Sequence, residues 1–141
     1  MIMVKILEWN EIIDLSNNLS AKLTFKNFDG IISIGRGGAI MGAILASRLG
    51  TRLYTVFVTH RGKGVDKETK IVRLDVTPEL KEGRYLLVDD QCSSGESFEL
   101  IKKNLANLHL ESASLICHEK VYHPDYYELS TDEEVIFPYE L

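Results

Sequence analysis

Short apolar runs alternate with helical segments along this chain, and this alternation constrains its fold more than any other feature. Ile12, Leu15, Leu19 and Leu23 recur at three- and four-residue steps, the spacing of an amphipathic helix that Asn10 is expected to cap. The expected strands cover residues 31–34, 52–58, 71–76, 84–88, 112–117, 126–129 and 135–137, and two further helices cover residues 39–49 and 96–108. Strands that alternate with helices build βαβ units, so we expect an α/β fold: a mainly parallel, twisted sheet flanked by helices.

Composition limits the partners of this chain. Its 141 residues are 45% hydrophobic and 26% charged, which suits one globular domain spanning residues 1–141. The net charge is −5, and an acidic domain does not attract the nucleic-acid backbone, so we expect no nucleic-acid partner. No apolar run approaches the roughly 18 residues of a membrane span. Cys92 and Cys117 suit a reducing compartment, and neither they nor the four histidines have metal-ligand spacing. We therefore expect a cytoplasmic protein without membrane contact.

The most informative segment is residues 86–97, where two adjacent carboxylates, Asp89 and Asp90, follow a buried strand. A loop of small residues and the start of a helix come next, and helix-terminal amides attract an anion such as phosphate. The hydroxyls of Ser93, Ser94 and Ser97 can donate further hydrogen bonds to the anion. Gly95 lets the backbone come close to it. The carboxylates suit sugar hydroxyls or a hydrated magnesium ion. The segment therefore predicts a site for a phosphorylated sugar, with a plain acidic strand end and Ser/Gly helix cap as the alternative.

A second glycine-rich segment, residues 35–38, also follows a strand and is expected to be a loop. Its glycines let backbone N–H groups converge on an anion, and Arg36 can add a charged donor. A tight turn with a surface arginine is the alternative. Because ligands bind at the carboxyl ends of parallel strands, both segments should face one cleft. The polar, glycine-bearing stretch of residues 59–70 is expected to be a third loop, and its charges by themselves indicate a solvated one.

Residues 86–97 resemble the phosphoribosyl pyrophosphate (PRPP) motif of the type I phosphoribosyltransferases: an apolar strand, two acidic residues, a short loop and Ser-Gly-x-Ser. Residues 31–50 are similar to that family's pyrophosphate loop with its helix, and residues 60–70 stand where the family has a flexible catalytic loop. The tail, with residues 125–127 and 135–140, resembles the small base-binding hood of compact xanthine-guanine phosphoribosyltransferases. The likeness runs from Trp9 onward.

The resemblance implies a magnesium-dependent transferase of purine salvage that joins a nucleobase to the ribose 5-phosphate of PRPP. Among the nucleobases, it favours a 6-oxopurine. The implied catalytic residues are Asp89, Asp90 and Ser93, and the two aspartates are also the implied magnesium ligands. The implied PRPP and 5-phosphate residues are Asp89, Asp90, Ser93, Ser94, Gly95, Glu96 and Ser97. The implied pyrophosphate residues are Arg36, Gly37 and Gly38, and the implied base-binding residues are Lys120, Val135 and Ile136. A homodimer or homotetramer is also implied.

Two residues depart from the family's pattern. Ser93 replaces an aspartate that handles a purine proton, and serine is no general base near neutral pH. Glu134 replaces the aromatic residue that stacks on the base, a role that Tyr139 or Phe137 could take over. These departures favour an alternative, a PRPP- or nucleotide-binding regulatory protein. A phosphate-binding domain of unrelated chemistry would require that the two glycine-containing segments not share a cleft.

Overall fold

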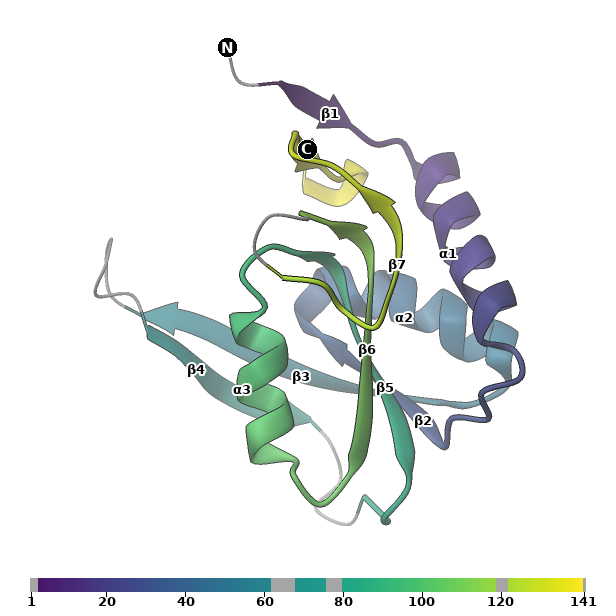
Figure 1. The fold of residues 1–141 in the computed structure, drawn as a ribbon, viewed down its shortest axis with the longest axis vertical. Coiled ribbons are helices and arrows are strands. Elements are labelled where there is room, and N and C mark those ends of the chain that lie inside the picture. The colour runs from purple at the N-terminus through teal and green to yellow at the C-terminus, as the bar shows by residue number, and fades with distance from the viewer. Residues whose placement is uncertain (1–2, 62–67, 76–79, 119–121, 141) are drawn as a thin grey trace.

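The computed structural model describes residues 3–61, 68–75, 80–118 and 122–140, with backbone alone at residues 59–61 and 68–75. Its strands are β1 Val4–Ile6, β2 Gly30–Ile34, β3 Arg52–Arg61, β4 Glu68–Asp75, β5 Arg84–Cys92, β6 His109–Cys117, β7 Tyr126–Ser130 and β8 Glu134–Ile136. Its α-helices are α1 Trp9–Leu23, α2 Gly35–Leu49 and α3 Glu96–Asn104, and Pro138–Glu140 form a 3₁₀ turn, η2. Six strands form one sheet in the order β4-β3-β2-β5-β6-β7 (Figure 1).

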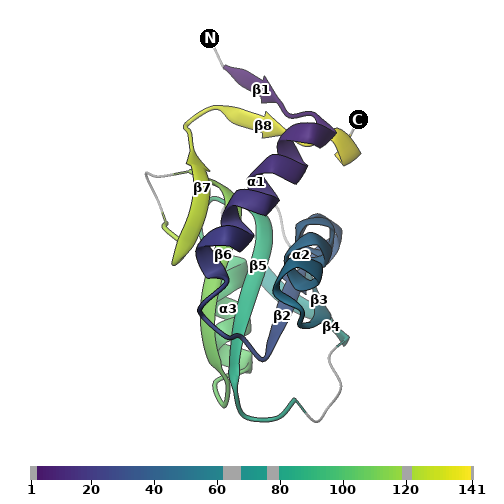
Figure 2. The ribbon, with the colours of Figure 1, turned by 90° about the vertical axis from the view of Figure 1, so that its right-hand side faces the viewer.

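The expected fold class is confirmed. Neighbouring strands from β3 to β7 pair in parallel, and β4 alone runs antiparallel, against β3. Helices α1 and α2 cover one face of the sheet and α3 covers the other (Figure 2). This arrangement follows from the sequence, because every residue of the β-branched run in β2 is buried between helical layers. Within the described residues no helix is both long and apolar enough to cross a membrane.

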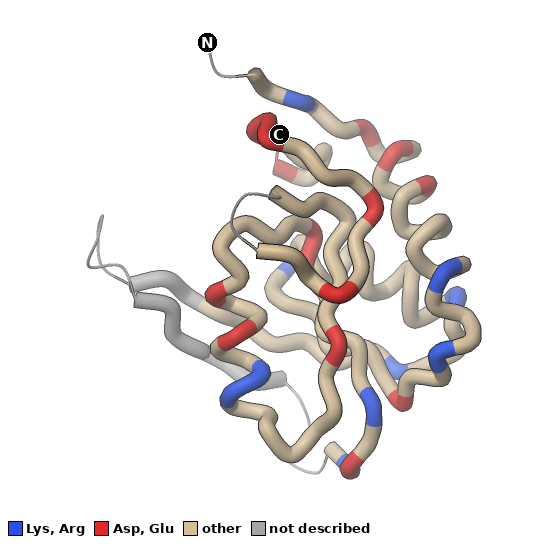
Figure 3. Tube along the Cα trace, in the orientation of Figure 1, with Lys and Arg blue, Asp and Glu red and all other residues tan. Residues whose placement is uncertain are grey.

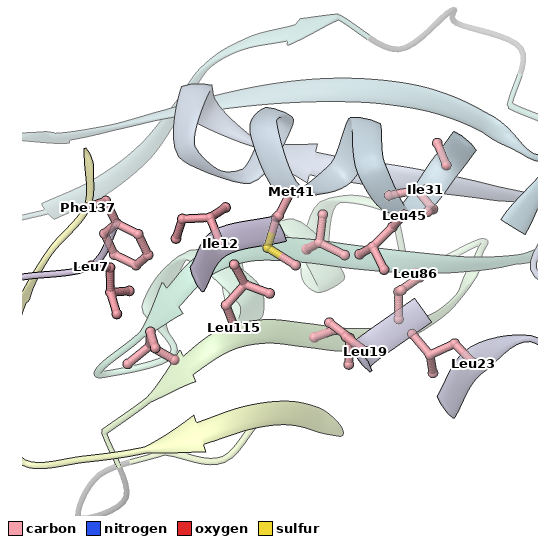
Figure 4. Close-up of a cluster of buried hydrophobic side chains, with 14 of the residues drawn as sticks. Leu7, Ile12, Leu19, Leu23, Ile31, Met41, Leu45, Leu86, Leu115 and Phe137 are labelled. Atoms are coloured by element: carbon pink, nitrogen blue, oxygen red, sulfur yellow. The ribbon is translucent and has the colours of Figure 1, made fainter. Parts of the chain in front are cut away.

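The main core lies between α1, α2 and the sheet, and it joins the two ends of the chain. Leu7 and Phe137 are almost fully buried and pack at one end of the cluster, as Figure 4 shows. β1 pairs in parallel with β8 as a separate two-stranded sheet, and the N–H of Leu7 donates to the carbonyl of Ile136 at 2.9 Å. The C-terminal tail is thus anchored beside the start of α1.

Several boundaries differ from those expected. α1 begins after Glu8, which forms a capping box with Glu11, so Asn10 is not the cap. β3 and β4 continue into the stretch expected to be a loop, because cross-strand pairing from Thr55 to Arg61 stabilises a polar sequence that has no strand pattern of its own. The loop of residues 62–67 lies outside the described residues. β1 was not expected, because three residues carry too little periodicity to predict a strand.

Two corrections concern the glycine-rich and acidic segments. Residues 35–38 form the first turn of α2 rather than a loop, with Gly35 at a φ of 61°. Asp89 and Asp90 lie inside β5, which continues to Cys92 because β6 pairs with it as far as Cys117. Both segments therefore belong to regular elements, which fix their backbones more firmly than loops would.

Candidate functional site

The acidic pair lies where the central strands end. Asp89 is in register with Ser114 on β6, while β2 pairs with β5 only as far as Val88 and then turns into α2. The first turn of α2 therefore lies directly against the pair. The two segments meet at the carboxyl ends of neighbouring strands, as expected, but they line two separate hollows rather than the one cleft expected.

Gly37 and Gly38 allow this close contact between α2 and β5. A Cβ atom at Gly37 would overlap Oδ2 of Asp90, and one at Gly38 would lie 2.7 Å from the carbonyl oxygen of Val88. Real Cβ atoms do not come so near a carboxylate or a backbone oxygen. With alanine at either position, α2 could therefore not lie as close to β5 as it does. The glycines thus bring backbone amides of a helix N-terminus to the acidic pair.

A cavity of about 250 Å³ lies on the α3 side of the pair. It is lined by Asp89, Gln91, Cys92, Ser93, Ser94, Gly95, Glu96, Ser97 and Phe98. Gly95 precedes α3 with a φ of 79°, and its missing Cβ makes room for the ring of Tyr122, which stacks on Phe98 at 6.2 Å. All the expected PRPP and 5-phosphate residues except Asp90 therefore line one hollow at a helix N-terminus, and Ser93 and Ser94 are exposed.

A second cavity, of about 660 Å³, lies on the α2 side of the pair. It is lined by Arg36, Gly37, Ile40, Asp90, Tyr139 and Glu140. Arg36 is exposed in the first turn of α2, and its side chain makes no hydrogen bond or ion pair with the described part of the chain. Gly38 is buried beneath it. The acidic pair thus separates two hollows, because Asp89 lines the first and Asp90 the second.

The electrostatics of the pair call for a cation or for hydrogen-bond donors. The pKa of Asp89 is raised well above its usual value, chiefly by burial and then by the charge of Asp90. The two cavities are lined by four carboxylates and one cation, Arg36. Acidic residues also begin α3 and stand in η2 (Figure 3). Two neighbouring carboxylates are the oxygen ligands that magnesium prefers, and they leave most of its coordination to water and substrate. The residues present therefore fit a magnesium ion that arrives with an anionic ligand.

Tyr139, which the sequence offered only as a residue that could stack on the base, makes a contact in the site that the sequence did not predict. The Tyr139 hydroxyl donates to Oδ2 of Asp90 at 2.7 Å, and burial, followed by the charge of Asp90, raises the pKa of this phenol. The ring of Tyr139 stacks on Phe137 with centroids 5.4 Å apart. Phe137 itself is fully buried and cannot present a face to a base, which leaves Tyr139 as the aromatic residue of the tail that borders the cavity.

The other expected site residues have different surroundings. Lys120 lies outside the described residues. The side chain of Val135 is buried in the main core, so a ligand could reach only its backbone, while Ile136 is half-buried and Glu134 is exposed. The hydroxyls of Tyr122 and Tyr126 donate to Glu99 and Glu111, so both of these tyrosines of the tail are held by the protein itself. Cys92 is buried, and burial together with Cys117 raises the pKa of its thiol to about 12, so it is no nucleophile.

Comparisons with known proteins agree with this arrangement. A family model described as "Phosphoribosyl transferase domain" matches residues 4–138. A xanthine-guanine phosphoribosyltransferase of Gluconobacter oxydans is 30% identical over an alignment of 138 residues, which covers 94% of this chain and 82% of that protein. The crystal structure of a purine phosphoribosyltransferase from Pyrococcus horikoshii has a TM-score of 0.88 and 26% identity, covering 98% of this chain and 95% of that one. A Neisseria gonorrhoeae protein with bound ppGpp has a TM-score of 0.87 at 22% identity, covering 100% and 91%. Likeness in sequence and fold thus extends over nearly the whole chain.

Proposed function

The chain belongs to the phosphoribosyl transferase domain family, and from that membership we propose that it transfers the ribose 5-phosphate of PRPP to a 6-oxopurine. In this reaction the bond from ribose C1 to pyrophosphate breaks, a bond from C1 to a purine nitrogen forms, and the purine loses one proton. We assign the reaction to purine salvage, in keeping with the names of the Gluconobacter and Pyrococcus relatives.

The observation that carries the proposal is the acidic pair between two hollows. PRPP has a ribose with a phosphate at one end and a pyrophosphate at the other. Asp89 and Asp90 would accept hydrogen bonds from the ribose hydroxyls, and the hollow of residues 93–97 would hold the 5-phosphate. The wider hollow, which Arg36 and Gly37 line, would hold the pyrophosphate, whereas Gly38 is buried and does not line it. The acidic pair would thus bind the diol of the substrate, and one hollow would bind each of its two phosphate-bearing ends.

Magnesium belongs to this proposal through the substrate. When bound, the ion would supply positive charge to the leaving pyrophosphate, which Arg36 alone cannot neutralise. Asp89 and Asp90 would hold it directly or through water, and the substrate would complete its coordination. The protein's own contribution is to orient the ribose and to surround it with fixed amides and hydroxyls rather than bulk water.

The base is proposed from Lys120 and from the C-terminal tail. A lysine ammonium donates to a 6-oxo group but faces another donor when the base is adenine, which costs roughly tenfold to a hundredfold in preference. The relative from Gluconobacter is named for xanthine and guanine, which carry the 6-oxo group. Residues 135 and 136 would contribute backbone groups at the edge of the same tail.

Initial rates with guanine, xanthine, hypoxanthine and adenine, at fixed PRPP and magnesium, test this function. We expect the three 6-oxopurines to exceed adenine by tenfold or more. In Lys120→Ala this preference should shrink, while Lys103→Ala, a change at the end of α3, should leave it intact. A preference for adenine, or an unchanged preference in Lys120→Ala, would remove Lys120 from the base site.

A second candidate, a nucleotide-binding regulatory protein, is favoured by Ser93. This residue is exposed in the 5-phosphate hollow, where the family has a group able to accept a proton. A transferase lacking that group should be slow, and Ser93→Asp should accelerate it. PRPP or nucleotide binding without turnover of any base, in the parent and in Ser93→Asp, would support the regulatory protein instead.

We also propose that the protein acts as a homodimer or homotetramer. Large apolar side chains are exposed near the N-terminus, before and within β1 and in the first two turns of α1: Met3, Val4, Ile6, Trp9 and Ile13. A monomer seldom exposes such a group without a partner.

A further inference from the structure

We propose that Tyr139 is a positioning residue that holds the Asp90 carboxylate in the orientation that receives the ribose hydroxyls of PRPP. This inference rests on the proposed phosphoribosyl transfer. It starts from the hydrogen bond of 2.7 Å between the Tyr139 hydroxyl and Oδ2 of Asp90, which joins two residues 49 positions apart in the sequence.

The carboxylate of Asp90 is held from several sides. Its Oδ1 accepts the backbone N–H of Gln91 at 2.8 Å, and its Oδ2 accepts the Tyr139 hydroxyl while lying against Gly37. A carboxylate has about four lone-pair positions, so each oxygen still has one for a ligand. The carboxylate is therefore held in one orientation and still has lone pairs free to accept hydrogen bonds. Two adjacent ribose hydroxyls require both.

The ring of Tyr139 is itself firmly held. It stacks on buried Phe137 at an interplanar angle of 16° and packs against Trp9 with centroids 5.8 Å apart. The η2 turn is closed by a hydrogen bond of 3.0 Å from the N–H of Glu140 to the carbonyl of Phe137. Phe137 packs beside Leu7 in the main core (Figure 4). The Tyr139 ring that carries the hydroxyl therefore stacks on a residue that is anchored in that core.

A tyrosine suits this task better than a charged donor. A phenol is uncharged in the neutral pH range, so its hydroxyl donates to Asp90 there without carrying a charge. Because the donor is neutral, it orients Asp90 without cancelling the negative charge that a ribose hydroxyl or a hydrated magnesium ion needs. A lysine at this position would neutralise the carboxylate.

Tyr139→Phe tests this role, because phenylalanine keeps the ring contacts and removes only the hydroxyl. We expect the KM for PRPP to rise about tenfold, the loss typical of one hydrogen bond to a charged group, while the KM for the base changes less than about twofold. Tyr126→Phe is the matched control: its hydroxyl also donates to a carboxylate, Glu111, at 2.8 Å, but away from both cavities. This control should leave both KM values unchanged.

A double-mutant cycle separates positioning from a general loss of structure. PRPP affinity measured by calorimetry should fall about tenfold on Tyr139→Phe in the parent, and less than twofold in the Asp90→Asn background. An unchanged or lower KM for PRPP in Tyr139→Phe, or an equal loss in both backgrounds, would overturn the role of Tyr139. A parent protein that neither binds nor uses PRPP would instead overturn the proposed function, and this inference with it.

Discussion

The adjacent carboxylates of Asp89 and Asp90 lower the stability of the folded protein. Both are partly buried, and the charge of Asp90 lies close enough to disfavour the ionised form of Asp89. The Asp89 Oδ1 accepts the N–H of Asp90 at 2.9 Å, which offsets part of that cost but leaves the pKa of Asp89 raised. Carboxylates perturbed in this way gather at functional sites, because a ligand rather than the fold supplies their partners.

Asp89→Asn should therefore stabilise the ligand-free protein at neutral pH. A carboxyl whose folded pKa lies above the unfolded value of about 3.9 costs stability once pH rises through the folded pKa, and asparagine has no such cost. Melting curves at pH 7.5 should show a rise of a few degrees, since about 1 kcal/mol moves the melting temperature of such a domain by roughly 3–4 °C.

The pH dependence provides the check on this prediction. Below the unfolded pKa, Asp89 is protonated in both states, so the advantage of Asp89→Asn should vanish there. Asp14→Asn, at an exposed position of α1, should melt like the parent at every pH. A melting temperature of Asp89→Asn at or below that of the parent at pH 7.5 would contradict the repulsion described for the pair.

The sequence was a good guide to individual site residues and a poor guide to their contacts. Adjacent carboxylates after an apolar strand, and glycines after another, are local patterns, and they do meet at one edge of the sheet. The contact of Tyr139 with Asp90 has no local signal, because it depends on how β8 is held beside β1. Aromatic residues in a short tail look alike until the fold separates buried Phe137 from Tyr139.

At the scale of elements, the most important feature is that α2 follows β2 directly, without a loop between them. β2 ends at Ile34 and α2 starts at Gly35, so the first turn of α2 presses on β5. The sequence pattern favours a loop here, because glycine has low helix propensity. Close packing against Asp90 and the Val88 carbonyl overrides that propensity, which explains why the expected loop was wrong.

Gly37→Ala should damage the site more than the fold. The new methyl group would overlap Asp90 Oδ2 and push the carboxylate from its place, so we expect PRPP affinity to fall about 10–100-fold. Titration calorimetry measures this loss. Gly50→Ala is the control, since Gly50 ends α2 at a φ of 65° with open space around it.

Gly50→Ala should cost about 1 kcal/mol of stability through backbone strain and leave PRPP affinity unchanged. If Gly37→Ala binds PRPP as well as Gly50→Ala does, the close approach of α2 to β5 has no role in binding. The end of α2 at Gly50 was itself predicted from the sequence, because a left-handed cap requires glycine and so leaves a local signal.

At the scale of the whole molecule, the parallel sheet brings chain segments together that are far apart in sequence. The order β4-β3-β2-β5-β6-β7 sets β2 beside β5, and with them the N-termini of α2 and α3 on either side of Asp89 and Asp90. Alternating strands and helices predict this architecture, since βαβ crossovers have one favoured hand. The pairing of β1 with β8 was beyond the sequence, because both strands are three residues long.

We propose that Asp89 and Asp90 hold the ribose of PRPP between two anion-binding hollows. Calorimetric titration of PRPP with magnesium into the parent and into the double variant Asp89→Asn/Asp90→Asn tests it most directly. We predict binding to the parent, markedly weaker binding when magnesium is omitted, and a loss of affinity of about a hundredfold in the double variant, which still folds. Equal PRPP affinity in the parent and the folded double variant would contradict the account.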